Sequence, residues 1–296
     1  MSPEVYDCFT FSTELDLLAF RLDLLADVVD HVVIVEATRT FSGLPKTLLF
    51  TENRERFAAH LGRITHVVVD DMPDPVPDRW VLERFQRNAI ARGLIDADAG
   101  DIAIITDVDE IPDPARLRAL RDLEFDHLAL EMRLCYYRAD LESPQRWTQA
   151  RAARVGALLP PDEERAFEPT LVVREAGAHF SYIMNIDEVS QKYRWFAHDE
   201  LDSARSNDPR FLELAMHLGI FAPHRLMLDQ VPPETWSPVQ RALYEVHPEF
   251  FRSRPLPPNV VRRACRAYFG ARNRPRLPDM AVHTLDAALA RITGSR

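Results

Sequence analysis

The chain has 296 residues, of which 46% are hydrophobic, and a formal net charge of −10 at pH 7. Its length and apolar content suffice for one substantial core, which excludes a disordered chain, and its acidity argues against broad nucleic-acid binding because phosphate contacts need a basic face. No run of about eighteen apolar residues is present, and the opening MSPEVYDCFTFSTELD carries acids where a signal peptide needs a basic flank. We therefore expect a cytoplasmic protein.

The first part of the chain alternates strand and helix patterns. Two stretches rich in β-branched and aromatic residues, Val5–Phe11 and His31–Ala37, predict strands, and apolar residues recur at helical spacing between them. A second cycle predicts a helix at residues 52–61, a strand in ITHVVVDD, and a helix at residues 78–94 that begins at an aspartate cap. This alternation predicts an α/β fold with a Rossmann-like, mainly parallel sheet flanked by helices, and a ligand at the carboxyl ends of its strands.

The second part of the chain is less regular. DHLALEMRLCYY, PTLVVRE and GAHFSY have strand patterns, residues 186–200 have a helical pattern, and prolines become frequent between Pro223 and Pro258. We expect residues 1–222 to form the main domain. Residues 223–296 would then form a proline-rich segment and a basic C-terminal helical extension packed on the same domain.

The end of the chain has the opposite charge to the rest. From Arg252 to Arg296 it carries ten arginines against only Asp279 and Asp286. This basic tail suits docking on the acidic body of its own chain. The alternative is peripheral contact with an anionic membrane surface, which in a cytoplasmic protein is the inner face of the membrane, but only a short amphipathic stretch favours it.

A third predicted strand, residues 102–105, leads directly into the acidic sequence TDVDEIPDP. In an extended segment, Asp107 and Asp109 point to the same side, where two carboxylates repel each other unless a cation lies between them. Mg²⁺ and Mn²⁺ prefer such oxygen ligands and would bind the diphosphate of a substrate. The alternative is a helix cap before ARLRALRDL, which accounts for Asp113 better than for the other two aspartates.

Three functions remain open from these residues. A haloacid-dehalogenase-like phosphohydrolase would use Asp107 as a nucleophile, although the order of the acidic motifs disfavours it. A nucleotide-sugar-dependent glycosyltransferase would use the same aspartates for a metal and a diphosphate. A non-catalytic nucleotide-sugar-binding protein would bind the donor without turnover. No GxGxxG follows the first two strands, and Glu36 at the end of the second is suited to a ribose or base.

Four segments in order, YDCFTF with its following helix, WVLERFQRNAIARGL, IAIITDVDEIP and GAHFSY, resemble glycosyltransferase family 17. The resemblance spans roughly residues 5–200. It implies a GT-A fold, a UDP-GlcNAc donor, Mn²⁺ or Mg²⁺, and transfer of a β-linked sugar to a carbohydrate acceptor with inversion. For a cytoplasmic chain, a lipid-linked or capsular glycan precursor is the more plausible acceptor.

The resemblance also assigns roles to residues. Asp107 and Asp109 match the Asp-x-Asp motif of the family and would form the metal and diphosphate site. His179 matches the histidine of a Gly-Trp-His motif and would be a further metal ligand, although a histidine on a strand is more often structural. Ala178 replaces the tryptophan of that motif, so whatever the ring shapes, such as the acceptor or sugar pocket, is altered here.

Further donor-binding candidates lie on one helix and one loop. On the helix, Arg84, Arg87 and Asn88 precede the strand that carries the metal site, and arginine suits phosphate. In the loop ATRTFSGLPK, Thr38, Arg39 and Lys46 follow a strand end. A salt-bridged helix, with Glu83 four residues before Arg87, and an ordinary surface loop are the alternatives.

Inversion needs a base that accepts the proton of the acceptor hydroxyl. Asp187 and Glu188 are the nearest carboxylates downstream of His179 and are our candidates. A helix cap is the alternative for Asp187. Lys192, His198 and Glu200 also fit the family pattern, with roles in packing or acceptor binding.

Overall fold

A computed structural model describes residues 2–74, 78–195, 208–221, 223–224, 226–252 and 255–263. The expectations for His198, Glu200 and most of the basic tail fall outside these residues. None of the described helices is long and apolar enough to cross a membrane.

The strands are β1 Val5–Phe11, β2 His31–Ala37, β3 Ile64–Val69, β4 Ile102–Asp107, β5 Glu110–Pro112, β6 His127–Tyr136, β7 Leu141–Arg154, β8 Val172–Val173, β9 Gly177–Ser181, β10 Ile220–Phe221, β11 Leu226–Met227 and β12 Asp229–Gln230. The α-helices are α1 Leu15–Leu24, α2 Leu49–Glu52, α3 Arg79–Asn88, α4 Pro114–Leu120, α5 Pro161–Ala166, α6 Ile186–Trp195, α7 Pro209–Leu218 and α8 Pro238–Val246. Short 3₁₀ segments include η1 Arg54–Arg63 and η2 Ala89–Gly93.

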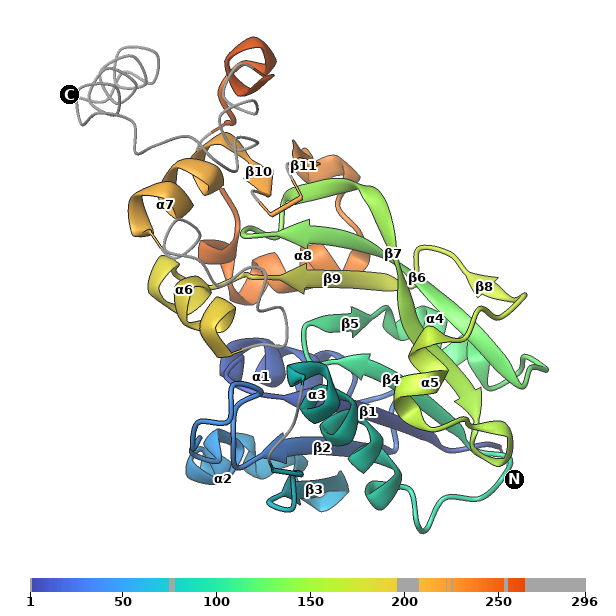
Figure 1. Cartoon of the computed structure of the whole chain (residues 1–296). Helices are drawn as coiled ribbons and strands as arrows, with labels where there is room; N and C mark the ends of the chain where they lie inside the picture. The colour runs from blue at the N-terminus through green and yellow to red at the C-terminus, as the bar shows by residue number, and fades with distance from the viewer. Residues whose placement is uncertain are drawn as a thin grey trace.

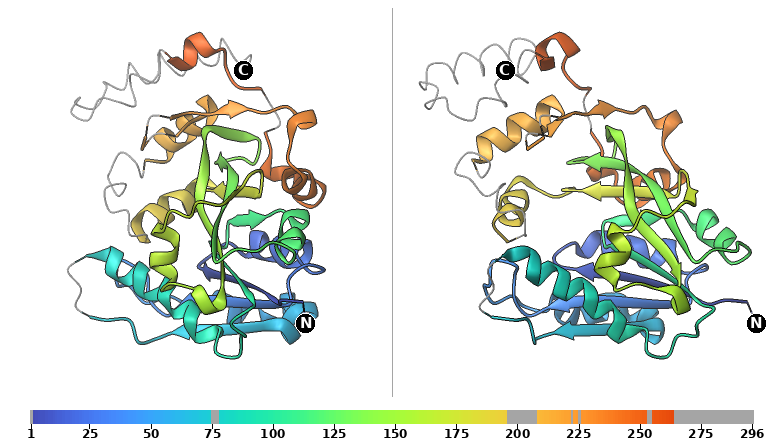
Figure 2. Two further views of the ribbon diagram at one scale, coloured as in Figure 1. Left: turned by 90° about the vertical axis from the view of Figure 1, so that its right-hand side faces the viewer. Right: turned by 45° about the vertical axis from the view of Figure 1, so that its right-hand side comes forward.

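One large sheet joins the two parts of the chain, and it confirms the α/β class. Its strand order is β3-β2-β1-β4-β7-β6-β9-β5, and the first four strands are parallel, as expected. The sheet then becomes mixed, because β7 runs antiparallel to both β4 and β6, while β9 runs parallel to β6. Figures 1 and 2 show the parallel strands at the bottom of the molecule and α7 and β10 near its top.

Most residues of β1, β2 and β4 are apolar because both faces of the sheet are covered there. On β1, Val5 and Phe9 pack into a cluster that includes Leu18 of α1. The alternate residue, Cys8, packs on the other face in a cluster that includes Leu82 of α3. Side chains alternate between the faces of a strand, so a strand buried on both sides is mostly apolar on both faces. Asp7 and Glu36 are exceptions and are buried beside cations.

The helix predicted at residues 52–61 differs from the structure. The α-helix ends at Glu52, and 3₁₀ turns follow from Arg54 to Arg63 with a kink at Phe57. The Asn53 side chain donates to the Leu49 carbonyl at 2.8 Å, which competes with regular helical bonding. The kink accompanies the burial of Phe57, whose ring stacks on Phe50 with centroids 5.4 Å apart.

The described part of the proline-rich segment packs on the main body. Val239 and Leu243 of α8 lie in one buried cluster with Leu17 of α1 and Phe180 of β9. The boundary at residue 222 stays a prediction, since the packing of this segment continues the same core.

Candidate active site

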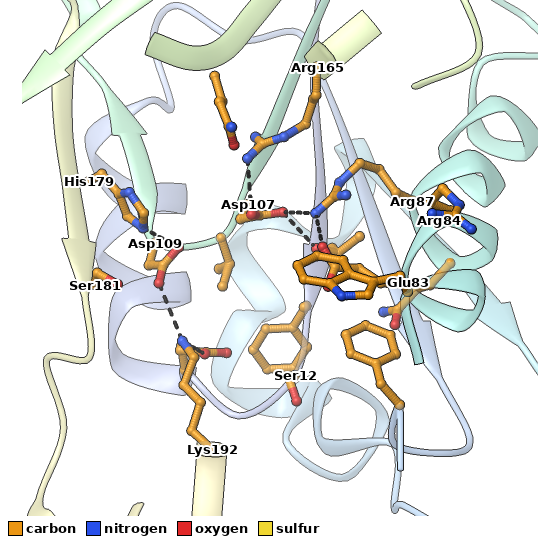
Figure 3. A pocket seen from close by; sticks show the side chains of 18 of the residues that line it. Ser12, Glu83, Arg84, Arg87, Asp107, Asp109, Arg165, His179, Ser181 and Lys192 are labelled. Atoms are coloured by element: carbon orange, nitrogen blue, oxygen red, sulfur yellow. Dashed lines mark hydrogen bonds and ion pairs between the residues drawn. The ribbon is translucent and has the colours of Figure 1, made fainter. Parts of the chain in front are cut away.

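A cavity of about 580 Å³ opens between the two parts of the chain (Figure 3). One wall lies at the carboxyl ends of β1 and β4, where the lining residues Thr10 and Asp107 are partners across the sheet. The opposite wall includes His179 of β9 and Lys192 of α6. The cavity lies at the carboxyl ends of the parallel strands, where α/β sheets bind ligands.

Asp107 is the last residue of β4 and faces two arginines. Its carboxylate lies 3.3 Å from Arg87 Nη2 and 3.2 Å from Arg165 Nη2, and it accepts a hydrogen bond from Thr10 Oγ1 at 3.1 Å. Burial would raise the pKa of Asp107, but the charges of Arg165 and Arg87 outweigh it and hold that pKa well below its usual range. Asp107 is therefore a carboxylate at neutral pH.

Asp109 lies beyond the strand end and faces a different set of partners. Its Oδ1 is 3.5 Å from His179 Nε2, and its Oδ2 is 3.5 Å from Lys192 Nζ. Burial would raise its pKa, but Lys192 and His179 lower it. In Figure 3 the two aspartates point into the same cavity, with the arginines on one side and His179 and Lys192 on the other.

His179 is held on a strand and against an indole. Its ring lies 4.5 Å from that of Trp147, centroid to centroid, and its backbone pairs with Glu110 on β5. Burial lowers the pKa of His179, but Asp109 more than compensates, so the pKa is raised. Nδ1 of this ring is buried and has no hydrogen-bond partner among the described residues.

Arg165 is a cavity residue that the sequence did not reveal. It comes from the short helix α5 and makes two hydrogen bonds to Glu110, at 2.6 and 2.7 Å, in addition to its contact with Asp107. The helix is fixed to α3, because Asp162 pairs with Arg87 at 2.9 Å and donates its backbone N–H to Asn88. Six residues are too few to show apolar residues at helical spacing. The sequence indicates the start of this helix only through the two adjacent prolines, Pro160 and Pro161, before DEER.

Arg21 is a second unpredicted residue, buried beneath the Asp-x-Asp turn. It pairs with Asp7 at 2.5 Å, and its Nη1 donates to the carbonyl oxygens of Asp107, Val108 and Glu110 at 2.9, 3.2 and 2.8 Å. Its side chain is fully buried. Arg21 thus fixes the backbone that presents both aspartates. In the sequence it appears only as a charge inside an apolar helical pattern.

Of the donor candidates, those with long cationic side chains line the cavity: Arg39, Lys46, Arg84 and Arg87. Arg39 is held by Asp74 at 3.0 Å and by the Met72 carbonyl. Lys46 approaches Glu36 at 3.3 Å.

The three other donor candidates lie behind the wall. Glu36 is fully buried and accepts from Lys46, His66 and the backbone of Phe50. Thr38 donates to the Val69 carbonyl on β3. Asn88 holds α5, as described above. In this structure they support residues of the wall and do not face the cavity.

The base candidates also lie away from the cavity. Asp187 and Glu188 are exposed at the start of α6 and are not among the lining residues. Glu188 accepts from the backbone N–H of Asn185 at 2.8 Å, and its own N–H donates to the Asn185 side chain. This reciprocal pair caps the helix through Asn185 and Glu188, whereas the cap considered from the sequence was Asp187.

Position 178 faces away from the cavity, contrary to the suggestion that a ring there shapes a sugar pocket. His179 and Ser181 line the cavity, so the alternate residues Ala178 and Phe180 point to the opposite face of β9. Ala178 is fully buried there in a cluster with Ile111. The alanine in place of the family tryptophan therefore alters core packing behind the site.

The ion pairs around the two aspartates form two neighbouring groups, and in the part of the chain that the structure describes the carboxylates in these pairs outnumber the arginine and lysine side chains two to one. Around Asp107, Arg87 and Arg165 pair with Glu83, Asp107, Glu110 and Asp162. Around Asp109, Lys192 pairs with Glu14 and Asp109. A partly buried excess of negative charge attracts a further cation.

Asp109 and His179 fit a divalent ion as neighbouring ligands. Two ligands at about 2.1 Å from one ion are about 3 Å apart, close to the 3.5 Å between Asp109 Oδ1 and His179 Nε2. No group of three or more His, Cys, Asp or Glu side chains within the described ranges has the geometry of a complete metal site. Mg²⁺ and Mn²⁺ do not need one, because water and phosphate oxygens complete their shells.

Comparisons with known proteins agree with this geometry. Glycosyltransferase family 17 matches residues 1–214. Two curated relatives, the β-1,4-mannosyl-glycoprotein 4-β-N-acetylglucosaminyltransferases of Rattus norvegicus and Homo sapiens, are each 30% identical over 115 residues. These residues make up 36% of this chain and 21% and 22% of the two relatives, so the match spans about a fifth of the length of either relative.

One similar solved structure is the mannosyltransferase PcManGT from Pyrobaculum calidifontis, in complex with GDP-Man and Mn²⁺. It is 16% identical, with coverage of 98% of this chain and 81% of that one and a TM-score of 0.38.

The family match covers both walls of the cavity, from β1 through Asp107 and Asp109 to His179 and Lys192. The resemblance noted in four segments is therefore confirmed over most of the chain. The chain belongs to glycosyltransferase family 17.

Proposed function

We propose that this protein is an inverting, metal-dependent glycosyltransferase that moves GlcNAc from UDP-GlcNAc to a hydroxyl of a carbohydrate acceptor. The observation that carries the proposal is the spacing of Asp109 and His179, which fits two ligands of one ion, beside ion pairs in which carboxylates outnumber arginine and lysine side chains. The family supplies the reaction class, and the two curated relatives supply GlcNAc as the first donor sugar to test.

The donor would lie along the cavity with its diphosphate near the two aspartates. Arg39, Lys46 and Arg84 would face the nucleoside end, while Arg87 and Arg165 would face the phosphates. Both arginines now contact Asp107. A diphosphate would compete for the same guanidinium groups, and arginine binds phosphate through its forked donors.

Asp109 and His179 would hold the Mn²⁺ or Mg²⁺, with Asp107 as the third proposed ligand. When bound, the ion would neutralise charge on the departing UDP. The protein side chains would hold the leaving group in one orientation, since Arg165 is anchored by Glu110 and Lys192 by Glu14 at 3.0 Å. The proton of the acceptor hydroxyl must pass to a base. Asp187 and Glu188 remain candidates only if α6 changes position.

The phosphohydrolase alternative receives no support from this geometry. The family match and the curated relatives instead favour glycosyl transfer. A protein that binds the donor without turnover would have the same donor site and would differ only in showing no sugar transfer.

Calorimetric titration of UDP-GlcNAc, with and without Mn²⁺, tests the donor site. We expect Mn²⁺-dependent binding that Asp109→Asn weakens at least about 10-fold, since even a group that supports a metal ligand is worth about 10–100-fold in metal affinity. The matched control is Asp122→Asn, an exposed aspartate outside the cavity. Binding that is equal without metal, or equal in Asp109→Asn, would contradict the proposed metal site.

A further inference from the structure

Four aromatic side chains form one wall of the cavity: Tyr136, Tyr182, Phe221 and His224. We call them the aromatic wall. The rings of Tyr136 and Phe221 stack with their centroids 4.0 Å apart. The centroid of the His224 ring lies 5.4 Å from that of Phe221. Phe221 and Tyr182 are buried, Tyr136 is half-buried and His224 is exposed. The wall therefore presents Tyr136 and His224 to the cavity over a fixed aromatic layer.

The wall lies on the side of the site away from the proposed donor position. Its residues come from the end of β6, the residue after β9, β10 and the following loop. The nucleoside candidates Arg39 and Lys46 follow β2, and three strands, β1, β4 and β7, separate β2 from β6 in the sheet. His179, one of the metal ligands proposed above, lies on β9, which is next to β6 in the sheet, so the wall borders the proposed metal position.

The backbone at Tyr182 is an independent sign of a functional constraint. Tyr182 has a φ of +56°, a left-handed conformation that bulky residues rarely adopt. Its neighbour across the sheet end, Tyr137, has a φ of +66° and donates its N–H to the Ser181 carbonyl at 3.1 Å. Strained backbone of this kind concentrates at binding and catalytic sites. Here it directs the Tyr182 ring toward Lys192, whose Nζ lies 5.2 Å from the ring centroid.

We propose that the aromatic wall is the acceptor subsite and that it binds the pyranose ring of a carbohydrate acceptor. This inference rests on the proposed function, because inversion requires the acceptor to approach the sugar of the donor from the side opposite UDP. The class of acceptor is inferred from the aromatic residues of the wall.

A pyranose fits this wall better than an acyl chain or a peptide side chain does. One face of a pyranose carries C–H groups, which pack on the electron-rich face of an aromatic ring, while its hydroxyls need polar partners at the ring edge. The wall supplies both, since Ser181 and Lys192 line the cavity beside the rings. The hydroxyl of Tyr136 is also a suitable partner, because burial raises its pKa to about 12 and keeps it a donor.

The test measures sugar contact and donor binding separately. Saturation-transfer NMR would use the full chain with UDP and Mg²⁺, and methyl glycosides of mannose, glucose and galactose as probes. We expect transfer to the ring C–H protons of at least one glycoside in the wild type. We expect His224→Ala and Tyr136→Leu to reduce it at least threefold, and Tyr244→Leu, an exposed tyrosine on α8, to leave it unchanged. UDP-GlcNAc affinity should stay within twofold in all three variants.

The outcomes distinguish the two proposals. Absence of transfer to every glycoside in a wild-type protein that binds UDP-GlcNAc would overturn the acceptor subsite, as would transfer that both wall variants leave intact. Glycoside contact that depends on the wall, in a protein that fails to bind UDP-GlcNAc, would support the subsite and overturn the proposed donor. His224→Ala keeps the result interpretable if Tyr136→Leu does not fold, because the His224 side chain is exposed.

Discussion

The two walls of the cavity are built in different ways. The wall at β1 and β4 rests on parallel strands whose apolar residues are covered on both faces, and Arg21 fixes the turn that follows them. The wall at β9 and α6 rests on a mixed sheet and on residues from separate segments, such as His179 and Lys192. The first wall combines regular parallel strands with one buried arginine that holds the turn, whereas the second gathers single side chains from separate segments. The predictions below test that contrast.

The largest effect should come from Arg21→Met, which removes the support under the first wall. Asp7 would be left as a buried charge without its partner, so we expect a loss of about 3–5 kcal/mol in the free energy of unfolding, measured in urea. Arg56→Met is the control, because its ion pair with Asp16 is exposed and should be worth at most about 1 kcal/mol. Similar losses in both variants would mean that Arg21 is not a special support.

Ala178→Trp should have the next largest effect, and it tests the packing of the second wall on the side that faces the core. The added ring would enter the packed cluster of Ile111 and Phe180, so we expect a destabilisation of about 1–3 kcal/mol by thermal unfolding. UDP-GlcNAc affinity in the variant that still folds should change little. Ala119→Trp on the exposed side of α4 is the control. A stable A178W variant with altered sugar contact would show that this position reaches the cavity.

Arg165→Lys should weaken donor binding without a large loss of stability. A lysine cannot reproduce the paired hydrogen bonds to Glu110, so the cation at the phosphate position would lose its anchor. We expect UDP-GlcNAc affinity to fall roughly tenfold, the equivalent of one hydrogen bond to a charged group. Arg118→Lys, an exposed change on α4, should have no effect in the same calorimetric titration. An unchanged affinity in the Arg165 variant would remove Arg165 from the donor site.

The smallest effect concerns the pH dependence of the metal-free protein. The pKa of His179 is raised by Asp109, so the stability from this pair is complete below the ordinary histidine value of 6.5 and is lost as pH rises through the raised pKa. Wild type should therefore exceed His179→Gln in stability by more at about pH 5.5 than at about pH 8, in urea unfolding. In an Asp109→Asn background the excess at about pH 5.5 should shrink or reverse, because burial lowers the pKa of His179 once Asp109 no longer opposes it. A difference that persists there would assign the effect to another group.

Several local features could be predicted from sequence because neighbouring residues cause them. β-Branched and aromatic content indicated β1 and β2, and a short apolar run indicated β4. Asp78 and Asp113 are helix caps, as their positions before α3 and α4 indicated.

The sequence by itself determined the α/β class, the acidic end of β4 and the family, because these depend on short patterns of hydrophobicity and on motifs in a fixed order. Only the tertiary structure decided which side chains meet there. Arg165 lies 58 residues from Asp107, and Lys192 lies 83 residues from Asp109. It also decided that Ala178 faces the core, because the pairing of β9 with β5 and β6 fixes the face of every residue on that strand.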